Sequence, residues 1–557
     1  MLVIWDGEDG RRVFRHPRDV ISADSPAQVP AALTAIEAAL GRGHYVAGWL
    51  GYELGHALEP RLAGLARDGA LLRLGVFAAF DDEASPPQGR AYAGPLAPEW
   101  DEAAYLRRFA RVKDYIAAGD VYQANLSFRA HFLFLGEPRA FYERLRAESG
   151  ARHCAFVDDG ERQVLSLSPE LFFDLAADGR ITVRPMKGTS ARQGDDAAER
   201  AQLAASAKDR AENLMIVDLI RNDLSRIAEP GTVAVSDLFK IESYPTLHTM
   251  VSTVTAKTRT GIGAAQILHA LFPCGSITGA PKIRAMEILA QLETSPRGPY
   301  CGALGWLAPD GSARFNVAIR TLTISHGRGE LGIGGGVVQD SDGAGEYAEC
   351  KLKARFFEQG RQPIELIETL RHARDFVRLN AHLVRMQNSA AVLGLAFDGA
   401  MARTALDEAV AGRAGPLRVR LTLDEEGTHR AAAYDLPPDP VHWTFRLATQ
   451  PVDSNDLLLR HKTSWRALYD QPHPDCDELI FCNERGELTE GARSNLFIRR
   501  GDVLLTPPLE AGLLPGVLRA ELIEQGGAKE AVLTPADLEG DVYFGNSLRG
   551  LIKGLRL

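Results

Sequence analysis

One break divides this chain into two parts with different residue patterns. A charged, helix-like run ends in Glu-Gln-Gly at residues 358–360, and Pro363 follows before a new apolar pattern begins at Ile364. A glycine followed by a proline is typical of the end of a helix. At 557 residues the chain is also longer than one hydrophobic core usually serves. We therefore expect two domains, at residues 1–358 and 363–557, joined by a linker at 359–362.

The composition argues against several classes of function. The net charge of −10 comes without a long block of like charges, so neither a nucleic-acid-binding surface nor a membrane-binding patch is expected. The apolar stretches are too short to span a bilayer, and the N-terminus lacks the pattern of a signal peptide. The six cysteines are dispersed, without the spacing of a zinc cluster or a redox dithiol. We expect a cytoplasmic protein with reduced thiols.

Three segments of the N-terminal part have clear periodicity. Residues 212–227 have apolar side chains at helical spacing, which predicts an amphipathic helix. Residues 315–322 alternate as in a strand, with Asn316, Ala318 and Arg320 on one face. Residues 331–338 predict a strand interrupted by glycines, as where a ligand approaches the backbone. The mixture predicts an α+β fold with large sheets.

A series of short motifs runs through residues 119–349 in a fixed order. Each is weak alone, because a lone lysine after a strand, or a Ser-Pro-Glu triplet, usually lies at a solvated surface. In order, spacing and residue type they resemble the chorismate-binding family, which includes anthranilate synthase, aminodeoxychorismate synthase component I, and the isochorismate and salicylate synthases. The motifs are residues 119–127, 168–170, 184–190, 212–213, 248–252 and 275–282, then Tyr300, Arg320, and residues 334–336 and 346–349.

The resemblance implies a polar chorismate site, in a chorismate-binding fold of large antiparallel sheets flanked by helices. Arg320 is implied to bind a substrate carboxylate as a fork, assisted by Tyr300. Glu170 matches the general acid that protonates the leaving hydroxyl, and His248 matches a histidine near the ring. The same match implies further substrate-binding residues at Gly188, Thr189, Gly275, Gly334, Gly336 and Lys353.

The resemblance also implies a Mg²⁺ ion. Glu212 and Glu349 match the family's carboxylates, which hold the ion on the ring carboxylate of the substrate. Magnesium prefers a few carboxylate oxygens together with substrate and water. The ion would stabilise charge that develops on the ring as the hydroxyl leaves.

Two positions distinguish the members of this family. Enzymes that add water carry a lysine base where this chain has Gln123, which disfavours isochorismate and salicylate synthesis. Anthranilate synthases typically have alanine where this chain has Lys187, whereas aminodeoxychorismate synthases typically have lysine. In that subfamily the amine adds to the ring as the 4-hydroxyl departs, and ammonia then displaces it. Gly335 replaces a usual alanine and lies outside this chemistry.

The last 195 residues carry a second series of motifs, which resembles the class IV aminotransferase family with its α/β fold. By that resemblance Lys462 carries pyridoxal 5'-phosphate as a Schiff base, and Arg385 binds its phosphate. Glu490 matches the acid partner of the ring nitrogen, and Ser547 completes the phosphate site with backbone at residues 517–518. The family's usual opening strand is missing before Glu365, so the fold begins late.

The fusion implies a function that neither part implies alone. Lys187 points to 4-amino-4-deoxychorismate as a product, and class IV members include the lyase that converts it to 4-aminobenzoate, a folate precursor, and pyruvate. The implied enzyme therefore has synthase and lyase activities and uses chorismate and ammonia. A separate glutamine amidotransferase subunit is implied as partner, because no cysteine lies in a Gly-x-Cys-x-Gly turn. A homodimer through residues 363–557 is also implied.

Two alternatives remain open at this point. One is an anthranilate synthase component I fused to a class IV amino-acid transaminase, which Lys187 disfavours. The other is a regulatory module that binds chorismate or tryptophan without turnover. The presence of Glu170, Lys187, Glu212, Glu349 and Lys462 argues against that reading. Product identification distinguishes the first alternative, and binding without turnover would favour the second.

Overall fold

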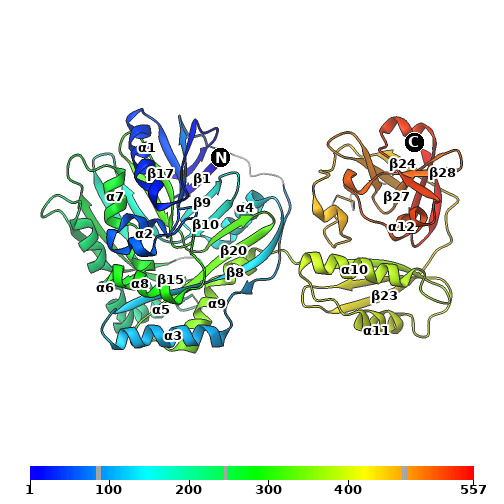
Figure 1. The fold of residues 1–557 in the computed structure, drawn as a ribbon. Coiled ribbons are helices and arrows are strands. Elements are labelled where there is room, and N and C mark those ends of the chain that lie inside the picture. The colour runs from blue at the N-terminus through cyan, green and yellow to red at the C-terminus, as the bar shows by residue number, and fades with distance from the viewer. Residues whose placement is uncertain (83–88, 193, 244–246, 467, 470–474) are drawn as a thin grey trace. The chain divides into compact units, whose positions relative to one another are not determined.

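The computed structural model describes residues 1–82, 89–192, 194–243, 247–466, 468–469 and 475–557. It contains two compact units (Figure 1). The first comprises Met1–Ala91 and Leu96–Arg361, and the second comprises Tyr92–Pro95 and Gln362–Leu557. Both units mix helices and strands, which confirms the expected α+β class. No helix among the described residues is long and apolar enough to cross a membrane.

Two large antiparallel sheets form the centre of the first unit. Neighbouring strands of the first sheet follow the order β16-β8-β20-β19-β10-β9-β1-β2, and β7 also pairs with β8. The second follows the order β13-β15-β12-β11-β18-β17-β4-β5-β3, and β14 also pairs with β15. The strands of the first sheet are β1 (Leu2–Gly7), β2 (Gly10–Phe14), β7 (Ala97–Pro98), β8 (Gln123–Gly136), β9 (His153–Asp158), β10 (Gln163–Ser168), β16 (Gly279–Ala280), β19 (Thr321–Ser325) and β20 (Arg328–Val337). Those of the second are β3 (Asp19–Ala23), β4 (Tyr45–Leu50), β5 (Leu72–Phe77), β11 (Leu171–Leu175), β12 (Arg180–Arg184), β13 (Met186–Ala191), β14 (Ala234–Ser243), β15 (Leu247–Lys257), β17 (Ala303–Leu307) and β18 (Ala313–Val317).

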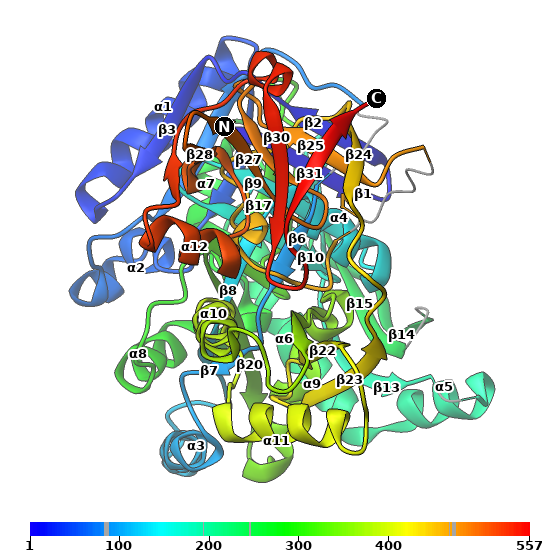
Figure 2. The ribbon, with the colours of Figure 1, turned by 90° about the vertical axis from the view of Figure 1, so that its right-hand side faces the viewer.

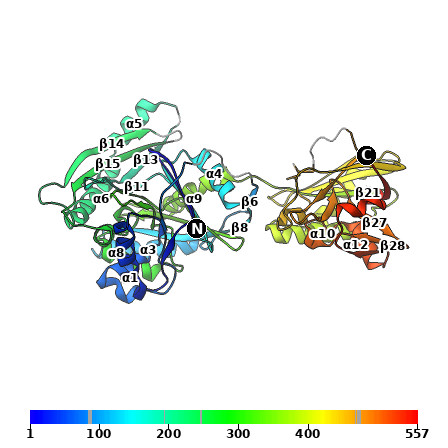
Figure 3. The same cartoon turned by 90° about the horizontal axis from the view of Figure 1, so that it is seen from above.

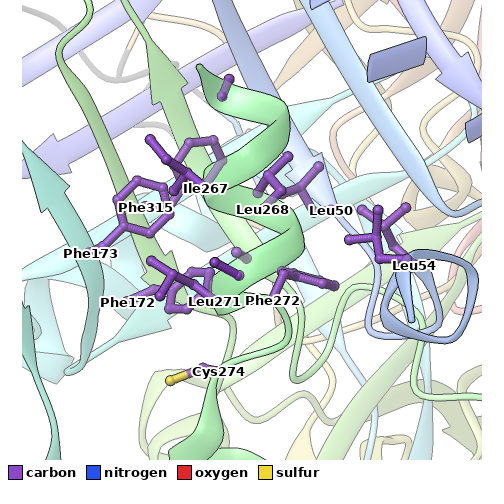
Figure 4. Close-up of a cluster of buried hydrophobic side chains, with 14 of the residues drawn as sticks. Leu50, Leu54, Phe172, Phe173, Ile267, Leu268, Leu271, Phe272, Cys274 and Phe315 are labelled. Carbon is purple, nitrogen blue, oxygen red and sulfur yellow. The ribbon is translucent and has the colours of Figure 1, made fainter. Parts of the chain in front are cut away.

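Helices cover these sheets and form the main hydrophobic core with the second one. In Figure 4, Ile267 and Leu271 project from α7 (Ala264–Leu271) toward phenylalanines of the sheet, among them Phe173 and Phe315, whereas Leu268 projects toward Leu50. Each such side chain contributes roughly 1.5–3 kcal/mol when it is fully buried. The other helices of the unit are α1 (Val29–Gly41), α2 (Leu54–Leu58), α3 (Glu102–Ala117), α4 (Pro138–Ser149), α5 (Asp196–Ala205), α6 (Ala207–Ser225), α8 (Lys282–Leu292) and α9 (Gly343–Gly360), with 3-10 turns η1 (Pro26–Gln28), η2 (Pro60–Leu65) and η3 (Gly275–Ile277).

A second cluster joins the two sheets directly. Val3 and Trp5 of the first sheet pack in one buried group with Trp49 and Trp306 of the second. Because side chains alternate along a strand, each sheet presents one apolar face to the other there. The opposite ends of the same sheets, near β20 and β13, are where the polar site lies.

The periodicities of the sequence were partly confirmed. The expected helix is α6, which begins at Ala207, five residues before the predicted start, and buries Val217, Ile220 and Leu224. The glycine-containing strand is β20, which is continuous. The strand predicted at residues 315–322 was wrong in its middle, because β18 ends at Val317 and β19 begins at Thr321. Arg320 has a φ of +48°, a left-handed conformation that interrupts a strand.

The second unit contains a small and a larger sheet, with the larger one drawn in colours from gold to red in Figure 2. The small antiparallel sheet has the order β21-β22-β23, and the larger one β26-β25-β24-β31-β30-β27-β28-β29, with β26 also paired to β27. The strands are β21 (Leu366–His372), β22 (Leu417–Leu423), β23 (His429–Asp435), β24 (His442–Leu447), β25 (Glu478–Cys482), β26 (Leu488–Gly491), β27 (Asn495–Arg500), β28 (Val503–Thr506), β29 (Ala528–Glu530), β30 (Asp541–Asn546) and β31 (Gly550–Arg556). The helices are α10 (Leu379–Leu393), α11 (Gly399–Val410) and α12 (Val517–Glu524), and the 3-10 turns are η4 (Leu457–Arg460), η5 (Leu509–Ala511) and η6 (Pro535–Glu539). The short strand β6 (Ala91–Ala93) lies at the boundary of the units, because Ala91 belongs to the first and Tyr92 to the second.

Candidate active sites

A cavity of about 320 Å³ lies in the first unit. Its walls come from β13, β20, α6 and α9, together with η3 and the turns that carry Tyr300 and Arg320. The predicted site residues that line it are Glu170, Lys187, Gly188, Thr189, Glu212, Tyr300, Arg320, Gly334, Gly336, Glu349 and Lys353. Segments more than 180 residues apart in the sequence are thus brought to one place.

Lys187 reaches this cavity from a bulge in β13. The register between β13 and β15 shifts between Met186 and Thr189, where β13 carries one residue more than the facing part of β15. Gly188 has a φ of +88°, and a Cβ there would lie 2.8 Å from Cβ of Asp209 on α6. Only glycine tolerates both the positive φ and the close approach of the Asp209 side chain. The removal of the ammonium from bulk water lowers the pKa of Lys187, although Glu212 opposes this shift.

Glu170 is buried at the cavity wall, with 4% of its surface exposed. Burial raises the pKa of Glu170 to about 7, while a hydrogen bond from Ser276 and the charge of Lys187 act in the opposite direction. Its backbone N–H donates to the Ser168 hydroxyl at 3.1 Å, which fixes the turn that carries it. A carboxyl group with this pKa is substantially protonated near neutrality, as a proton donor must be.

The glycines of β20 let neighbouring side chains approach the strand closely. A Cβ at Gly332 would lie 2.1 Å from the Tyr300 ring, and one at Gly336 would lie 2.8 Å from Nε2 of Gln123 and 3.2 Å from Nζ of Lys187. These glycines therefore leave space that larger residues would fill, as expected from the glycine-rich strand.

Acidic and basic side chains alternate on the helical wall of the cavity. Lys353 Nζ lies 2.9 Å from Glu349 Oε1 on α9, and Lys208 Nζ lies 4.0 Å from Glu212 Oε1 on α6. Burial raises the pKa of Glu212, and Lys187 opposes the rise. Burial also disfavours ionisation of Glu349, but Lys353 outweighs it, so the pKa of Glu349 lies below its usual value. The donor set consists of hard carboxylate oxygens, which fits Mg²⁺.

Several lining residues received no role in the sequence analysis, although Asn125, Ser276 and Glu346 lie within its motifs. Glu346 precedes Glu349 by three positions on α9, a spacing that places both on one helical face. Asn125 follows Gln123 by two positions on β8, and thus shares its face. The helical spacing from Glu349 and the strand spacing from Gln123 are therefore the sequence signals that could have found Glu346 and Asn125. Ser276, Lys208 and Asp209 line the cavity because separate elements meet there, which local periodicity does not predict.

Two expected site residues are not among the described residues that line the cavity. Gly275 lies in η3, where a Cβ would approach Leu219 Cδ2 to 2.5 Å, so it permits close packing of η3 on α6. His248 is fully buried on β15, and its Nδ1 lies 2.9 Å from the Ser243 hydroxyl. Its Nε2 faces Asp196 and Glu199 of α5. This placement differs from the expectation that His248 faces the substrate ring.

Lys462 occupies a partly buried position in the second unit. Its carbonyl accepts a hydrogen bond from Ile367 N of β21, and its Nζ donates to Oγ1 of Thr369 at 3.3 Å. Burial, together with the charge of Arg385, lowers the pKa of Lys462 to about 7. A substantial fraction of this amine is therefore neutral near neutrality and able to act as a nucleophile.

A chain of polar contacts connects Arg385 with Ser547. Arg385 donates to the Glu368 carboxylate at 2.8 and 2.6 Å. His382 Nδ1 lies 2.6 Å from the same carboxylate, and its Nε2 lies 2.8 Å from the Ser547 hydroxyl. Burial disfavours ionisation of Glu368, but Arg385 and His382 outweigh it and lower its pKa to about 2. Sequence motifs alone gave Glu368 and His382 no role, because the pairing depends on α10 packing against β21.

Glu490 joins this network through the segment at Leu514 and Pro515. Its Oε1 accepts from Leu514 N at 3.1 Å and from the Tyr469 hydroxyl at 3.0 Å, and Arg385 donates to the Pro515 carbonyl at 3.1 Å. Burial raises the pKa of Glu490 to about 8. A buried carboxyl group of this kind fits a partner that carries positive charge, such as a protonated pyridine nitrogen.

Comparison with known proteins assigns the two parts of the chain. Residues 70–359 match the model of the chorismate binding enzyme family, and residues 365–556 match that of class IV amino-transferases. Aminodeoxychorismate synthase component 1 of Klebsiella aerogenes is 46% identical over 248 residues, which are 44% of this chain and 55% of that protein. Anthranilate synthase component 1 of Streptomyces coelicolor is 41% identical over 259 residues, 46% of this chain and 50% of that protein.

A solved structure supports the fold of the first unit. Anthranilate synthase component I from Streptococcus pneumoniae TIGR4 superimposes with a TM-score of 0.53 at 24% identity, over 64% of this chain and 89% of that one. The chain spans about half the length of the curated relatives it matches. The family model, by contrast, covers more than half of this chain. The chain therefore belongs to the chorismate binding enzyme family, and it carries a class IV amino-transferase domain at residues 365–556.

Proposed function

We propose that the first unit aminates chorismate with ammonia to give 4-amino-4-deoxychorismate, and that the second releases pyruvate from it to give 4-aminobenzoate. The observation that carries the first half is the position of Lys187, in a cavity that also contains the buried acid Glu170. The relatives named as aminodeoxychorismate synthases support the same reading, whereas a 41% identical anthranilate synthase shows that identity alone does not choose between the two.

The cavity residues divide the amination between them. Arg320 and Tyr300 hold a substrate carboxylate, Arg320 by its planar fork of donors. Glu170 transfers its proton to the 4-hydroxyl, which leaves as water while the neutral amine of Lys187 forms a bond to the ring. Ammonia then displaces the lysine, and the proton released from nitrogen returns to the Glu170 carboxylate. Two displacement steps with lower activation barriers thus replace one displacement step with a high barrier.

The carboxylates on α6 and α9 are the proposed ligands of Mg²⁺. Glu212 and Glu349 would hold the ion, and Lys353, which now pairs with Glu349, would lie beside it. When bound, the ion supplies positive charge that stabilises negative charge on the substrate carboxylate and ring.

The second unit is proposed to bind pyridoxal 5'-phosphate. Lys462 would anchor it, Arg385 and the Ser547 hydroxyl would bind its phosphate, and Glu490 would keep the ring nitrogen protonated. When bound, the cofactor supplies an electron sink for the elimination of pyruvate. The lowered pKa of Lys462 lets its amine both accept and give up a proton near neutrality, as a base that moves protons on the substrate must.

Substitution of Lys187 tests the proposed amination. Lys187→Ala is expected to reduce ammonia-dependent turnover of chorismate by orders of magnitude, because the nucleophile is lost. Lys187→Arg is expected not to restore it, since a guanidinium stays protonated. Chorismate binding, measured calorimetrically with Mg²⁺, should persist in both. Lys240→Ala, an exposed lysine on β14, serves as the control.

Near-normal formation of 4-aminobenzoate by Lys187→Ala would contradict the covalent route. It would show that ammonia attacks the ring directly, and that Lys187 supplies at most positive charge. Loss of chorismate binding in the same variant would instead assign Lys187 to substrate binding.

A further inference from the structure

Three buried polar side chains of the second unit follow one another from Ser547 inward. Ser547 lies in the turn between β30 and β31, His382 lies on α10, and Glu368 lies on β21. The helix α10 packs against β21 and lies beside α12, as seen from above in Figure 3. The proposed function gives Ser547 a role at the phosphate of the cofactor, but it gives His382 none.

His382 occupies the middle of this series and contacts both neighbours. Its Nδ1 lies 2.6 Å from Glu368 Oε2, and its Nε2 lies 2.8 Å from the Ser547 hydroxyl. All three side chains are buried. A buried polar contact without a hydrogen bond costs free energy, so each contact needs one hydrogen between its two atoms.

The charges around His382 determine its protonation before an anion binds. Burial disfavours the ionised form of Glu368, but Arg385 and His382 outweigh it and lower the pKa of Glu368 to about 2. Burial lowers the pKa of His382, and Glu368 opposes this shift. The charges of Arg385 and Lys462 lower it as well. Near neutrality the carboxylate is therefore ionised and the imidazole is neutral.

These two states determine the direction of both hydrogen bonds. The ionised Glu368 can only accept, so Nδ1–H of His382 donates to it. Nε2 of the neutral imidazole then carries a lone pair, and the Ser547 hydroxyl donates to it. Because this donation uses the only hydrogen of the hydroxyl, the Ser547 oxygen offers a ligand nothing but lone pairs.

A phosphate dianion at Ser547 requires one further hydrogen. The dianion only accepts hydrogen bonds, so it adds a third contact without adding a hydrogen. Neutral His382 and Ser547 supply two hydrogens for three contacts. An imidazolium supplies the third, because it donates to Glu368 and to Ser547 at once and leaves the hydroxyl hydrogen of Ser547 free to point at the anion.

We propose that His382 is a positioning residue of the phosphate site, which takes up one proton from solvent as a phosphate group binds and thereby makes Ser547 a donor. The inference rests on the proposed cofactor site, because it requires an anion at Ser547. Arg385 already neutralises Glu368, so an imidazolium without an anion would add a second uncompensated cation beside Lys462. The negative charge of a bound phosphate compensates it.

Other charged groups lie on the elements around His382. The permanently charged arginines among them are paired with carboxylates: Arg378 with Glu521, and Arg371 and Arg549 with Asp439. These guanidinium groups do not titrate near neutrality. The pKa of Lys462 is about 7 and that of Glu490 is about 8, so both can also gain a proton when an anion binds. A test of His382 must therefore compare variants that keep both residues.

Sulfate distinguishes a proton on the protein from a proton on the ligand, because sulfate stays a dianion near neutrality. The full chain without cofactor is titrated calorimetrically with sulfate and with inorganic phosphate, in buffers of different ionisation enthalpy that report the protons taken up. We expect the wild type to take up about one proton more than His382→Gln, whose amide does not titrate. Its sulfate affinity should accordingly fall with rising pH by up to about 10-fold more per pH unit.

Two further variants make this comparison specific. Ser547→Ala removes the third contact, so it should lose the additional proton uptake as well. His429→Gln is the matched control, because burial also lowers the pKa of His429 in the same unit, but its imidazole packs on the Phe397 ring. This variant should take up as many protons as the wild type. Equal thermal unfolding without sulfate would show that the variants are folded.

NMR of the loaded chain gives an independent measurement. In ¹⁵N spectra of the histidine side chains with pyridoxal 5'-phosphate bound, the signal that is missing from His382→Gln should show two protonated nitrogens. With pyridoxal, which lacks the phosphate, the same signal should show one.

Three outcomes would overturn the proposal. Equal proton uptake by the wild type and His382→Gln would place the proton on another group, such as Lys462. Uptake with inorganic phosphate but none with sulfate would place it on the ligand. Both outcomes would leave the cofactor site itself intact. Failure of the wild type to bind sulfate, phosphate and pyridoxal 5'-phosphate would instead refute that site, and this inference with it.

Discussion

At the scale of single residues, burial determines the chemistry of the chorismate cavity. Glu170 and Lys187 are an acid and a base whose pKa values are displaced toward neutrality by removal from water. Each partly offsets the shift of the other through its charge. Acid and base pairs whose pKa values are displaced in this way are typical of sites for proton transfer and nucleophilic attack.

Glu170 should set the alkaline limb of the pH profile for amination. Its raised pKa means that the protonated form persists up to about pH 7 and is lost as the pH rises further. kcat/KM for chorismate should therefore fall above about pH 7, when free NH3 is held constant. Glu170→Gln should lower turnover by about 10²- to 10⁴-fold, because the proton donor is lost. Persistence of the same alkaline limb in the residual activity of this variant would assign the limb to another group.

Motifs predicted the cavity residues unevenly. Glu170, Lys187 and Glu212 were predicted because each lies within a short run whose residue types the chemistry requires. His248 lies in such a run as well, yet its side chain faces α5. Glu368 became apparent only through its pairing with Arg385, which depends on α10 packing on β21. A motif gives the identity of a side chain, but packing of distant elements decides its direction.

At the scale of elements, the glycines of β20 shape the cavity. The apolar run interrupted by glycines predicted this strand and its approach to a ligand, but not which glycine faces which neighbour. Gly336 faces Gln123 and Lys187, whereas Gly335 faces Glu346 and Lys353 on α9. The alternation of side chains along a strand separates the two neighbours onto opposite faces.

This pair of glycines provides a matched test. Gly336→Ala adds a methyl group within 2.8 Å of the buried Gln123 amide and 3.2 Å of Lys187 Nζ. We expect amination to fall by about 10²-fold, because displacement of a reacting group by ~1 Å has effects of this size. Gly335→Ala meets the flexible ends of Glu346, at 3.2 Å, and Lys353, at 3.6 Å, and should remain close to wild type. Equal steady-state rates for the two variants would show that Lys187 tolerates displacement.

The turn between β18 and β19 shows the limit of periodicity. Residues 315–322 alternate throughout, but β18 ends at Val317, three residues before Arg320 with its positive φ. The backbone N–H of Ile319 donates to the Val317 carbonyl at 2.7 Å, which closes a tight turn. Arg320 reaches the cavity from this turn. Side-chain pattern does not encode such a backbone conformation, particularly for a residue other than glycine.

At the scale of the whole molecule, each proposed site lies within one unit. The residues that line the cavity all belong to the first unit, and Lys462, Arg385, Glu490 and Ser547 all belong to the second.

Lys462→Ala should therefore abolish pyruvate release and the visible absorbance of bound cofactor, while formation of the amino intermediate continues. Loss of both activities would show that the two sites depend on each other, and an unchanged spectrum would show that another lysine anchors the cofactor.

The nitrogen source should be ammonia when the chain acts alone. Hydrolysis of glutamine by amidotransferases uses a reactive cysteine, but burial raises the pKa of Cys274 to about 12 and that of Cys350 to about 11, so these thiols stay protonated. We expect turnover with ammonium and none with glutamine, until a separate amidotransferase is added. Robust glutamine-dependent turnover by the purified chain would contradict this expectation.

Identification of the aromatic product tests the central claim most directly. The full chain is incubated with chorismate, Mg²⁺, pyridoxal 5'-phosphate and ¹⁵N-labelled ammonium, and the products are separated and examined by mass spectrometry and NMR. The proposed chemistry of Lys187 and Lys462 predicts 4-aminobenzoate with ¹⁵N at the 4-position, together with pyruvate. Labelled 2-aminobenzoate as the main product would contradict it, because the chain would then be an anthranilate synthase despite Lys187.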